Sequence, residues 1–280
     1  MADTPIPDPV RDALDVWLAA HDEVARNTIE GLYLVGSVAR DDWTPHSDSD
    51  AGAVVADPSD PDLFDELAAA QDLIRERVEI SIDGPYVAWG DLVVPPVAVH
   101  RPWVLDGEYH VDGESFEINP VTWYTLATYG VAVRGERRDR LGVYVDVADR
   151  RSWVAENLDT YWRGVADALA AGVADSDESE WGGEVLEWVA LGVARMLFTF
   201  ETGDVASKSG AGRWASERIP GHQAIFDRAV AVRSTPGVVT SDELVECADV
   251  ARKIVTAVSG RGGRRPRRTR ARCRRRSSLR

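Results

Sequence analysis

The pattern of apolar and polar positions divides the chain into a first half of mixed elements and a second half of helices. In the first half, short apolar runs and period-two alternation predict strands, and apolar residues at helical spacing predict helices. In order, these elements are helix 8–27, strand 32–35, strand 51–55, helix 61–77, strand 78–82, sheet-edge segments 92–99 and 103–105, helix 120–129 and strand 131–133. We therefore expect an α/β (α+β) domain with a mixed sheet over residues 1–148.

The second half shows helical periodicity in five consecutive segments. They cover residues 149–171, 184–202, 211–218, 221–234 and 241–259. Stretches that contain glycine or proline separate them, and Ser241 followed by Asp242 and Glu243 is a typical helix start. The pattern predicts an all-α helical bundle over residues 149–260, and the cleft between the two domains is the expected substrate site.

A Gly36-Ser37 turn follows the first strand, and Asp48 and Asp50 stand at the start of the second. Residues two apart on a strand point to the same face, so the two carboxylates lie side by side and repel unless a cation separates them. Magnesium fits, because it is usually bound by one or two carboxylates plus substrate phosphates. Gly36 lets the backbone approach a phosphate, and Ser37 is expected to open a short helix. A lone D-x-D is more often a solvated turn, but the flanking strands and the Gly-Ser turn favour a metal–nucleotide site.

The predicted third strand carries another carboxylate. If Val78, Ile80 and Ile82 face the core, Glu79 emerges on the opposite face. A strand next to that of Asp48 would then bring Glu79 to the metal. The alternative is an exposed strand glutamate with no task.

The spacing of these motifs resembles a known enzyme family. The pattern resembles the motif of the nucleotidyltransferase superfamily that includes DNA polymerase β: a Gly-Ser pair is followed, after ten intervening residues, by D-x-D. Residues 45–50, Pro-His-Ser-Asp-Ser-Asp, resemble the aminoglycoside adenylyltransferases that modify streptomycin and spectinomycin. Residues 202–220 are similar to that family's T-G…K…W-A…E-R-L-P run in a different part of the chain. One departure is Ser49, where such strands usually carry a large aliphatic residue.

The resemblance implies roles for particular residues. It assigns Asp48, Asp50 and Glu79 to the metal, with Glu79 also the base that activates the acceptor hydroxyl. It places Gly36, Ser37, Ser47 and Lys208 at the nucleotide, whereas Arg195 could face the triphosphate or form a buried pair. Trp181, Glu184 and Glu187 fall where the family binds the aminosugar. A tyrosine that the family uses near the nucleotide is replaced around Val232-Arg233, which leaves adenine packing open.

The activity implied by this resemblance is transfer of AMP from ATP to a hydroxyl of an aminoglycoside, with release of pyrophosphate and Mg²⁺ as cofactor. Two alternatives stay open. Other members of the superfamily modify protein or RNA hydroxyls, and an inactive relative would bind nucleotide without turnover. The intact Gly-Ser turn and three carboxylates speak against the inactive relative.

Net charge changes the list of expected partners. The chain carries −15, but residues 261–280 hold 11 arginines and no acid, which leaves −26 on residues 1–260. Such an acidic body repels nucleic acid and attracts polycations such as an aminoglycoside. The tail 261–280 is expected to be disordered, because its charges repel and it has almost nothing apolar. Nucleic-acid binding is therefore expected, if at all, only through this tail.

The remaining expectations concern location and assembly. No apolar run reaches the roughly 18 residues of a membrane helix, and the N-terminus shows no secretory pattern. Cys247 and Cys273 lie in unlike contexts, so neither a disulfide framework nor a zinc site is expected. We expect a cytoplasmic protein without a membrane partner, and a monomer.

Overall fold

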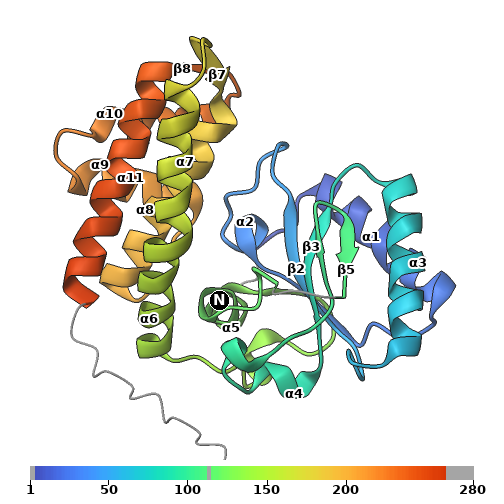
Figure 1. Cartoon of the computed structure of the whole chain (residues 1–280). Coiled ribbons are helices and arrows are strands. Elements are labelled where there is room, and N and C mark those ends of the chain that lie inside the picture. The colour runs from blue at the N-terminus through green and yellow to red at the C-terminus, as the bar shows by residue number, and fades with distance from the viewer. Residues whose placement is uncertain (1–3, 112–114, 263–280) are drawn as a thin grey trace, which may run out of the picture.

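The computed structural model describes residues 4–111 and 115–262, which form a sheet domain beside a bundle of helices (Figure 1). Six strands make one mixed sheet in the order β5-β4-β3-β2-β1-β6. The strands are β1 (Gly31–Leu34), β2 (Ser49–Val54), β3 (Ile82–Val87), β4 (Trp103–Leu105), β5 (Glu108–His110) and β6 (Val131–Arg134). β2 and β3 run parallel, and the other neighbouring pairs are antiparallel.

Helices cover both faces of this sheet. α1 (Asp8–Val24) and α3 (Pro61–Arg77) pack on one face, where Ala51 and Ala53 of β2 join their core. α3 starts where its sequence predicts, because Pro61 occupies the first turn and the Asp60 side chain accepts the amide of Asp62. α5 (Pro120–Tyr129) contributes to the core on the other face, together with Val54 of β2. Side chains alternate along a strand, so Asp50 faces the α5 side.

The predicted strand 78–82 is wrong, because the strand that pairs with β2 begins only at Ile82. Residues 79 and 80 form a bend. The alternation of apolar and polar residues there therefore belongs to a connecting segment whose apolar side chains are partly buried, and not to a strand. The parallel register places Asp83, rather than Glu79, beside Asp50. The predicted edge segment 92–99 is also not a strand. It holds the end of α4 (Trp89–Leu92) and a 3₁₀ turn (Pro96–Ala98), since prolines remove the donors that a strand needs.

The second half is the predicted bundle. Its elements are α6 (Val147–Asn157), a π-helical turn (Leu158–Trp162), α7 (Arg163–Ala174), α8 (Gly183–Thr202), α9 (Lys208–Arg218), α10 (Gln223–Ser234) and α11 (Ser241–Gly262), with a small hairpin of β7 (Glu180–Gly182) and β8 (Val238–Thr240). α8 is buried along most of its length and is the core of the bundle. The predicted fold class, a mixed-sheet domain followed by a helical bundle, is confirmed.

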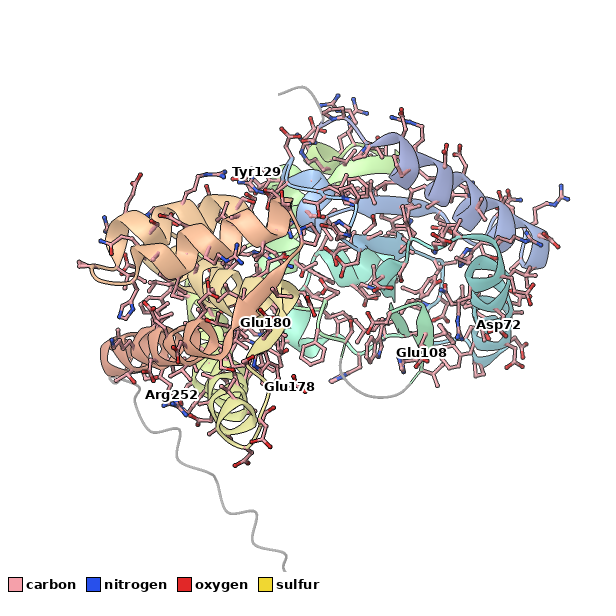
Figure 2. All side chains as sticks on the ribbon, turned by 90° about the horizontal axis from the view of Figure 1, so that it is seen from above. Asp72, Glu108, Tyr129, Glu178, Glu180 and Arg252 are labelled. Carbon is pink, nitrogen blue, oxygen red and sulfur yellow. The ribbon has the colours of Figure 1, made fainter. Side chains whose placement is uncertain are left out.

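α5 joins the two halves of the molecule (Figure 1). The hydroxyls of Tyr124 and Tyr129 both donate to Asp204 Oδ1, at 3.1 and 2.8 Å, just beyond the end of α8. Figure 2 shows Tyr129 at this junction. The guanidinium of Arg40 lies 3.5 Å above the Tyr129 ring. The two domains therefore meet through a polar, aromatic contact right beside the Gly-Ser turn.

Two further expectations concern membrane-spanning helices and the C-terminal tail. Within residues 4–111 and 115–262, no helix is long and apolar enough to span a membrane. α11 continues to Gly262, past the predicted end at residue 259. The rest of the predicted disordered tail, and Cys273 within it, lies outside the described residues.

Candidate active site

The Gly-Ser turn lies against the carboxylates of β2. β1 ends at Leu34, the amide of Val35 bonds to the carbonyl of Asp50, and the four-residue helix α2 (Gly36–Ala39) follows. Gly36 has φ +55°, and a Cβ at this position would lie 1.7 Å from Oδ2 of Asp50. Only glycine allows both this backbone angle and this close approach. The glycine of the motif therefore sets the position of the turn against the carboxylate.

Asp48 and Asp50 form the centre of the predicted site. Both line the cleft between the two halves, with Asp48 exposed and Asp50 half-buried. Burial and then the charges of Glu117 and Asp48 raise the pKa of Asp50 well above its usual value. Converging carboxylates that repel in this way favour a bound cation.

The residues fit a magnesium ion that also binds substrate phosphates. No three His, Cys, Asp or Glu side chains in the described part of the chain are grouped so as to hold a metal by themselves. Two carboxylates are nevertheless enough when phosphate oxygens complete the shell. Asp48 and Asp50 are the residues that would hold the ion.

Glu79 does not join this pair. It is exposed on the bend that precedes β3, so the expectation that a neighbouring strand brings it to the metal is not met. Two other acids act on Asp50 electrostatically, Glu117 and Asp83. Asp83 already accepts the amides of Asp106 and Gly107, at 2.9 and 3.2 Å, and is therefore occupied in holding the β4–β5 turn.

Glu117 supplies a third carboxylate from an unexpected place. It lies just before α5, whose start is fixed by Asn119, because the Asn119 side chain accepts the amides of Val121 and Thr122. The Thr122 hydroxyl in turn donates to Oε2 of Glu117 at 3.3 Å. Burial raises the pKa of Glu117, whereas the charge of Arg195 opposes this shift. Glu117 lines the same cavity as Asp48 and Asp50, with a volume of about 280 Å³.

Basic and hydroxyl groups also lie around the carboxylates. Ser37, Ser47, Arg195 and Lys208 line one small cavity with Gly36, Asp48 and Asp50. The Ser37 hydroxyl oxygen is buried and has no hydrogen-bond partner among the described residues. Unpaired buried donors are rare unless a ligand uses them. The predicted nucleotide-binding residues thus lie together, and their roles stay predictions.

Glu187 of α8 is the centre of an ion-pair network that crosses the cleft. Its Oε1 lies 2.5 Å from Nη1 of Arg233 and 3.4 Å from Nζ of Lys208. Arg233 also lies 3.3 Å from Oδ2 of Asp42, and its Nη2 donates to the Asp42 carbonyl at 2.6 Å. Asp42 Oδ2 also accepts the amide of Ser209 at 3.0 Å. Two helices of the bundle therefore hold the loop that leads into Asp48.

Trp181 and Glu184 lie apart from this cluster. Trp181 belongs to β7, at one end of the bundle (Figure 1), and its indole N–H donates to Ser241 at 3.0 Å. Glu184 is exposed in the first turn of α8. The cavity instead meets α8 at Trp188, Gly192 and Arg195. These three positions share one helix face through spacings of four and three. Of the three residues predicted for the aminosugar, the structure brings only Glu187 to the site.

A Gly-Ser turn facing paired carboxylates, with basic residues supplied by a second domain, defines a two-domain nucleotidyltransferase. Residues 157–256 match the family described as aminoglycoside adenylyltransferase, C-terminal domain. The fold is similar to the crystal structure of the spectinomycin adenyltransferase AAD(9) from Enterococcus faecialis with ATP and spectinomycin. The TM-score is 0.65 at 15% identity, over 88% of this chain and 99% of that chain. No curated protein matched the sequence.

These findings confirm the predicted class and family. Residues 157–256 of the bundle match the model of that family's C-terminal domain, and the structural similarity extends the shared fold over the sheet domain. The enzyme class predicted from the sequence, a nucleotidyltransferase, is confirmed with it.

Sequence reasoning missed several residues that line or brace the site. These are Asp42, Asp83, Glu117, Trp162, Trp188 and Arg233. Trp188 could have been found, because it stands seven residues before Arg195 on the same helix face. Glu117 offered no comparable signal, since it is placed by the turn before α5 rather than by a periodic element.

Proposed function

We propose that this chain transfers AMP from ATP to a hydroxyl group of an aminoglycoside-type antibiotic, streptomycin or spectinomycin, and releases pyrophosphate. The observation that supports this best is the composition of the cleft. Asp48, Asp50, Arg195 and Lys208 line both cavities of the cleft. One cavity adds the partnerless Ser37 hydroxyl, and the other adds two tryptophans and Glu117. The shared cations and Ser37 suit a triphosphate, and the tryptophans with Glu117 suit a cationic sugar.

On the nucleotide side, Ser37, Ser47, Lys208 and Arg195 would position the phosphates. Asp48 and Asp50 would hold magnesium, which supplies charge neutralisation of the triphosphate when bound. Lys208 is placed for this task as the first residue of α9, where Ser207 caps the helix by accepting the amide of Gly210 at 3.0 Å. Its present partner, Glu187, would give way to phosphate oxygens, because Glu187 keeps a closer ion pair with Arg233.

On the acceptor side, the reaction is the attack of a hydroxyl oxygen on the α-phosphorus. The bond from that phosphorus to the β-bridging oxygen breaks, and pyrophosphate leaves. Glu117 is the carboxylate best placed to accept the hydroxyl proton, because it lines the cavity that also contains Asp48, Asp50 and both tryptophans. A raised pKa brings a carboxylate closer to the value that suits a general base. Glu79 stays the prediction from the resemblance, and its exposed position does not support it.

The acidic surface supports a cationic acceptor. Residues 1–260 carry −26, so a polycation is attracted over distances of about a Debye length, roughly 8 Å at physiological salt. The rate of acceptor association should fall as salt is raised, whereas neutral ligands should respond weakly.

The test is pyrophosphate release with ATP, magnesium and each drug in turn. The proposal predicts release that depends on streptomycin or spectinomycin and is lost in Asp48→Asn and Asp50→Asn. Asp91→Asn is a suitable control, because Asp91 pairs with Arg101 at 2.8 Å outside the cleft. Absence of drug-dependent pyrophosphate from folded, ATP-binding protein would refute the proposed reaction.

A further inference from the structure

Four aromatic rings lie in consecutive contact along the cleft. The ring centroids of Phe116 and Tyr161 are 5.7 Å apart, those of Tyr161 and Trp162 are 5.3 Å apart, and those of Trp162 and Trp188 are 5.7 Å apart. We call Phe116, Tyr161, Trp162 and Trp188 the aromatic row. Phe116 precedes α5, and the other three come from the bundle. Both domains therefore build it.

The aromatic row passes from the cavity of the carboxylates into a second, larger one. Trp162 and Trp188 line the cavity of about 280 Å³ that contains Asp48, Asp50 and Glu117. Phe116 and Tyr161 line a cavity of about 540 Å³ that also contains Glu156. Because Phe116 adjoins Glu117 and Tyr161 adjoins Trp162 in the chain, the two cavities are neighbours.

Ordinary core packing does not explain this arrangement. Phe116 is 58% exposed, Trp188 44% and Tyr161 36%, so three of the four rings stay accessible. Contiguous exposed apolar surface of this kind usually marks a binding site. An open aromatic row beside the reacting groups therefore points to a ligand.

The backbone departs from a regular α-helix at the residues that carry Tyr161 and Trp162 of the aromatic row. Residues 158–162 form a π-helical turn within the otherwise continuous helix from α6 to α7. Such turns occur frequently at functional sites. Opposite this turn, a Cβ at residue 192 would lie 2.1 Å from the Trp162 ring, so Gly192 allows that ring to lie directly on α8.

We propose that the aromatic row binds the rings of the acceptor that lie beyond the one receiving AMP, so that the enzyme prefers a multi-ring aminoglycoside such as streptomycin to the single fused ring system of spectinomycin. This inference rests on the proposed function. The acceptor hydroxyl lies in the smaller cavity, near Asp48, Asp50 and Glu117. The rest of the molecule extends over Tyr161 and Phe116 into the larger cavity.

The chemistry of the surface suits such an occupant. Guanidinium and ammonium groups are attracted to aromatic faces. The smaller cavity contains three carboxylates, those of Asp48, Asp50 and Glu117, against the two cations of Arg195 and Lys208, and Glu156 lines the larger cavity. The C–H faces of sugar rings pack on the same aromatic surfaces. Spectinomycin, with one compact ring system, would fill the smaller cavity and leave Phe116 and Tyr161 uncovered.

The test uses the full chain with Phe116→Ala and Tyr161→Ala. We expect each variant to raise KM for streptomycin about tenfold, as for a lost aromatic contact to a cation, while KM for ATP stays within about twofold. KM for spectinomycin should not change, and Tyr161→Phe, which keeps the ring, should retain the wild-type KM for streptomycin. Val245→Ala, at an equally exposed position on α11, is the matched control.

Binding separates this inference from the proposed reaction. Calorimetry with a non-hydrolysable ATP analogue should show streptomycin binding that both alanine variants weaken by a similar factor. Weakened binding without AMP transfer would refute the reaction and keep the aromatic row as a drug-binding surface. No streptomycin binding to the wild type, or equal effects of the variants on both drugs, would overturn the inference.

Discussion

Arg233 allows the sharpest prediction about how the two domains are held together. Its side chain is only 3% exposed, and it meets the carboxylates of Glu187 and Asp42, which are 17% and 13% exposed. Replacing it with methionine keeps most of the volume but removes the charge. Glu187 and Asp42 would then face each other across the cleft without their shared cation.

The expected cost follows from these contacts. Removal of one partner from a buried ion pair costs about 3–5 kcal/mol. The lower end applies here, because Lys208 stays 3.4 Å from Glu187 and the amide of Ser209 still donates to Asp42. We therefore expect Arg233→Met to reduce the unfolding free energy by about 3 kcal/mol. We also expect a raised KM for ATP, since Arg233 holds the loop that leads into Asp48.

Urea unfolding followed by tryptophan fluorescence and circular dichroism is the assay, with both probes required to coincide before a two-state analysis is used. The control is Arg252→Met. Arg252 pairs with Asp167 at 2.8 Å, but the two side chains are 41% and 59% exposed, so its loss should cost less than about 1 kcal/mol. A double-mutant cycle with Glu187→Gln should give a coupling energy above about 1 kcal/mol. Equal stability losses in both arginine variants, or strict additivity in the cycle, would refute the buried network.

Three further predictions test the site and the fold. Glu117→Gln should lower kcat by about 10² or more, whereas Glu79→Gln should leave it within about twofold; the reverse order would restore Glu79 as the base. Gly36→Ala should abolish nucleotide binding, because its Cβ would lie 1.7 Å from Oδ2 of Asp50. Gly172→Ala should bind nucleotide normally, because the space around residue 172 is open. Equal affinities of the two variants for ATP would contradict this prediction. Burial lowers the pKa of His21 to about 4. Since the unfolded chain binds this proton more tightly, unfolding free energy should fall by about 2.5 kcal/mol between about pH 7 and about pH 4.5, a slope that His21→Gln should lack in urea titrations.

The fold was largely predictable, because most elements carry local signals. Pro61 after Asp60, and Pro120 after Asn119, mark helix starts that the structure confirms at those residues. Apolar spacing also located the helices of the bundle. The third strand failed because apolar alternation over residues 78–82 is the same in a strand and in a partly covered bend. Only the register with β2, a tertiary property, shows that Asp83 stands beside Asp50.

The site was predictable on its nucleotide side and much less so on its acceptor side. Gly36, Ser37, Asp48 and Asp50 are neighbours in one strand–turn–strand unit, so their proximity follows from local geometry. The acceptor side is assembled from α8, the π-helical turn and the segment before α5, which lie far apart in sequence. Sequence spacing cannot show that Trp162 and Trp188 line one cavity with Glu117, because that depends on how the domains pack.

The structure gives Arg233 a role that the sequence did not suggest. The resemblance led us to expect a missing tyrosine around Val232-Arg233, and the structure places there a buried cation that bridges Glu187 and Asp42. Arg233 therefore makes an ionic contact between the domains.

Transfer of AMP to a cationic drug in this cleft can be followed directly by mass spectrometry of streptomycin and spectinomycin after incubation with the protein, ATP and magnesium. We expect a product that carries one AMP, formed together with one pyrophosphate, absent from Asp50→Asn and produced more efficiently from streptomycin. Unmodified drugs, recovered with protein that is folded and still binds ATP, would contradict it.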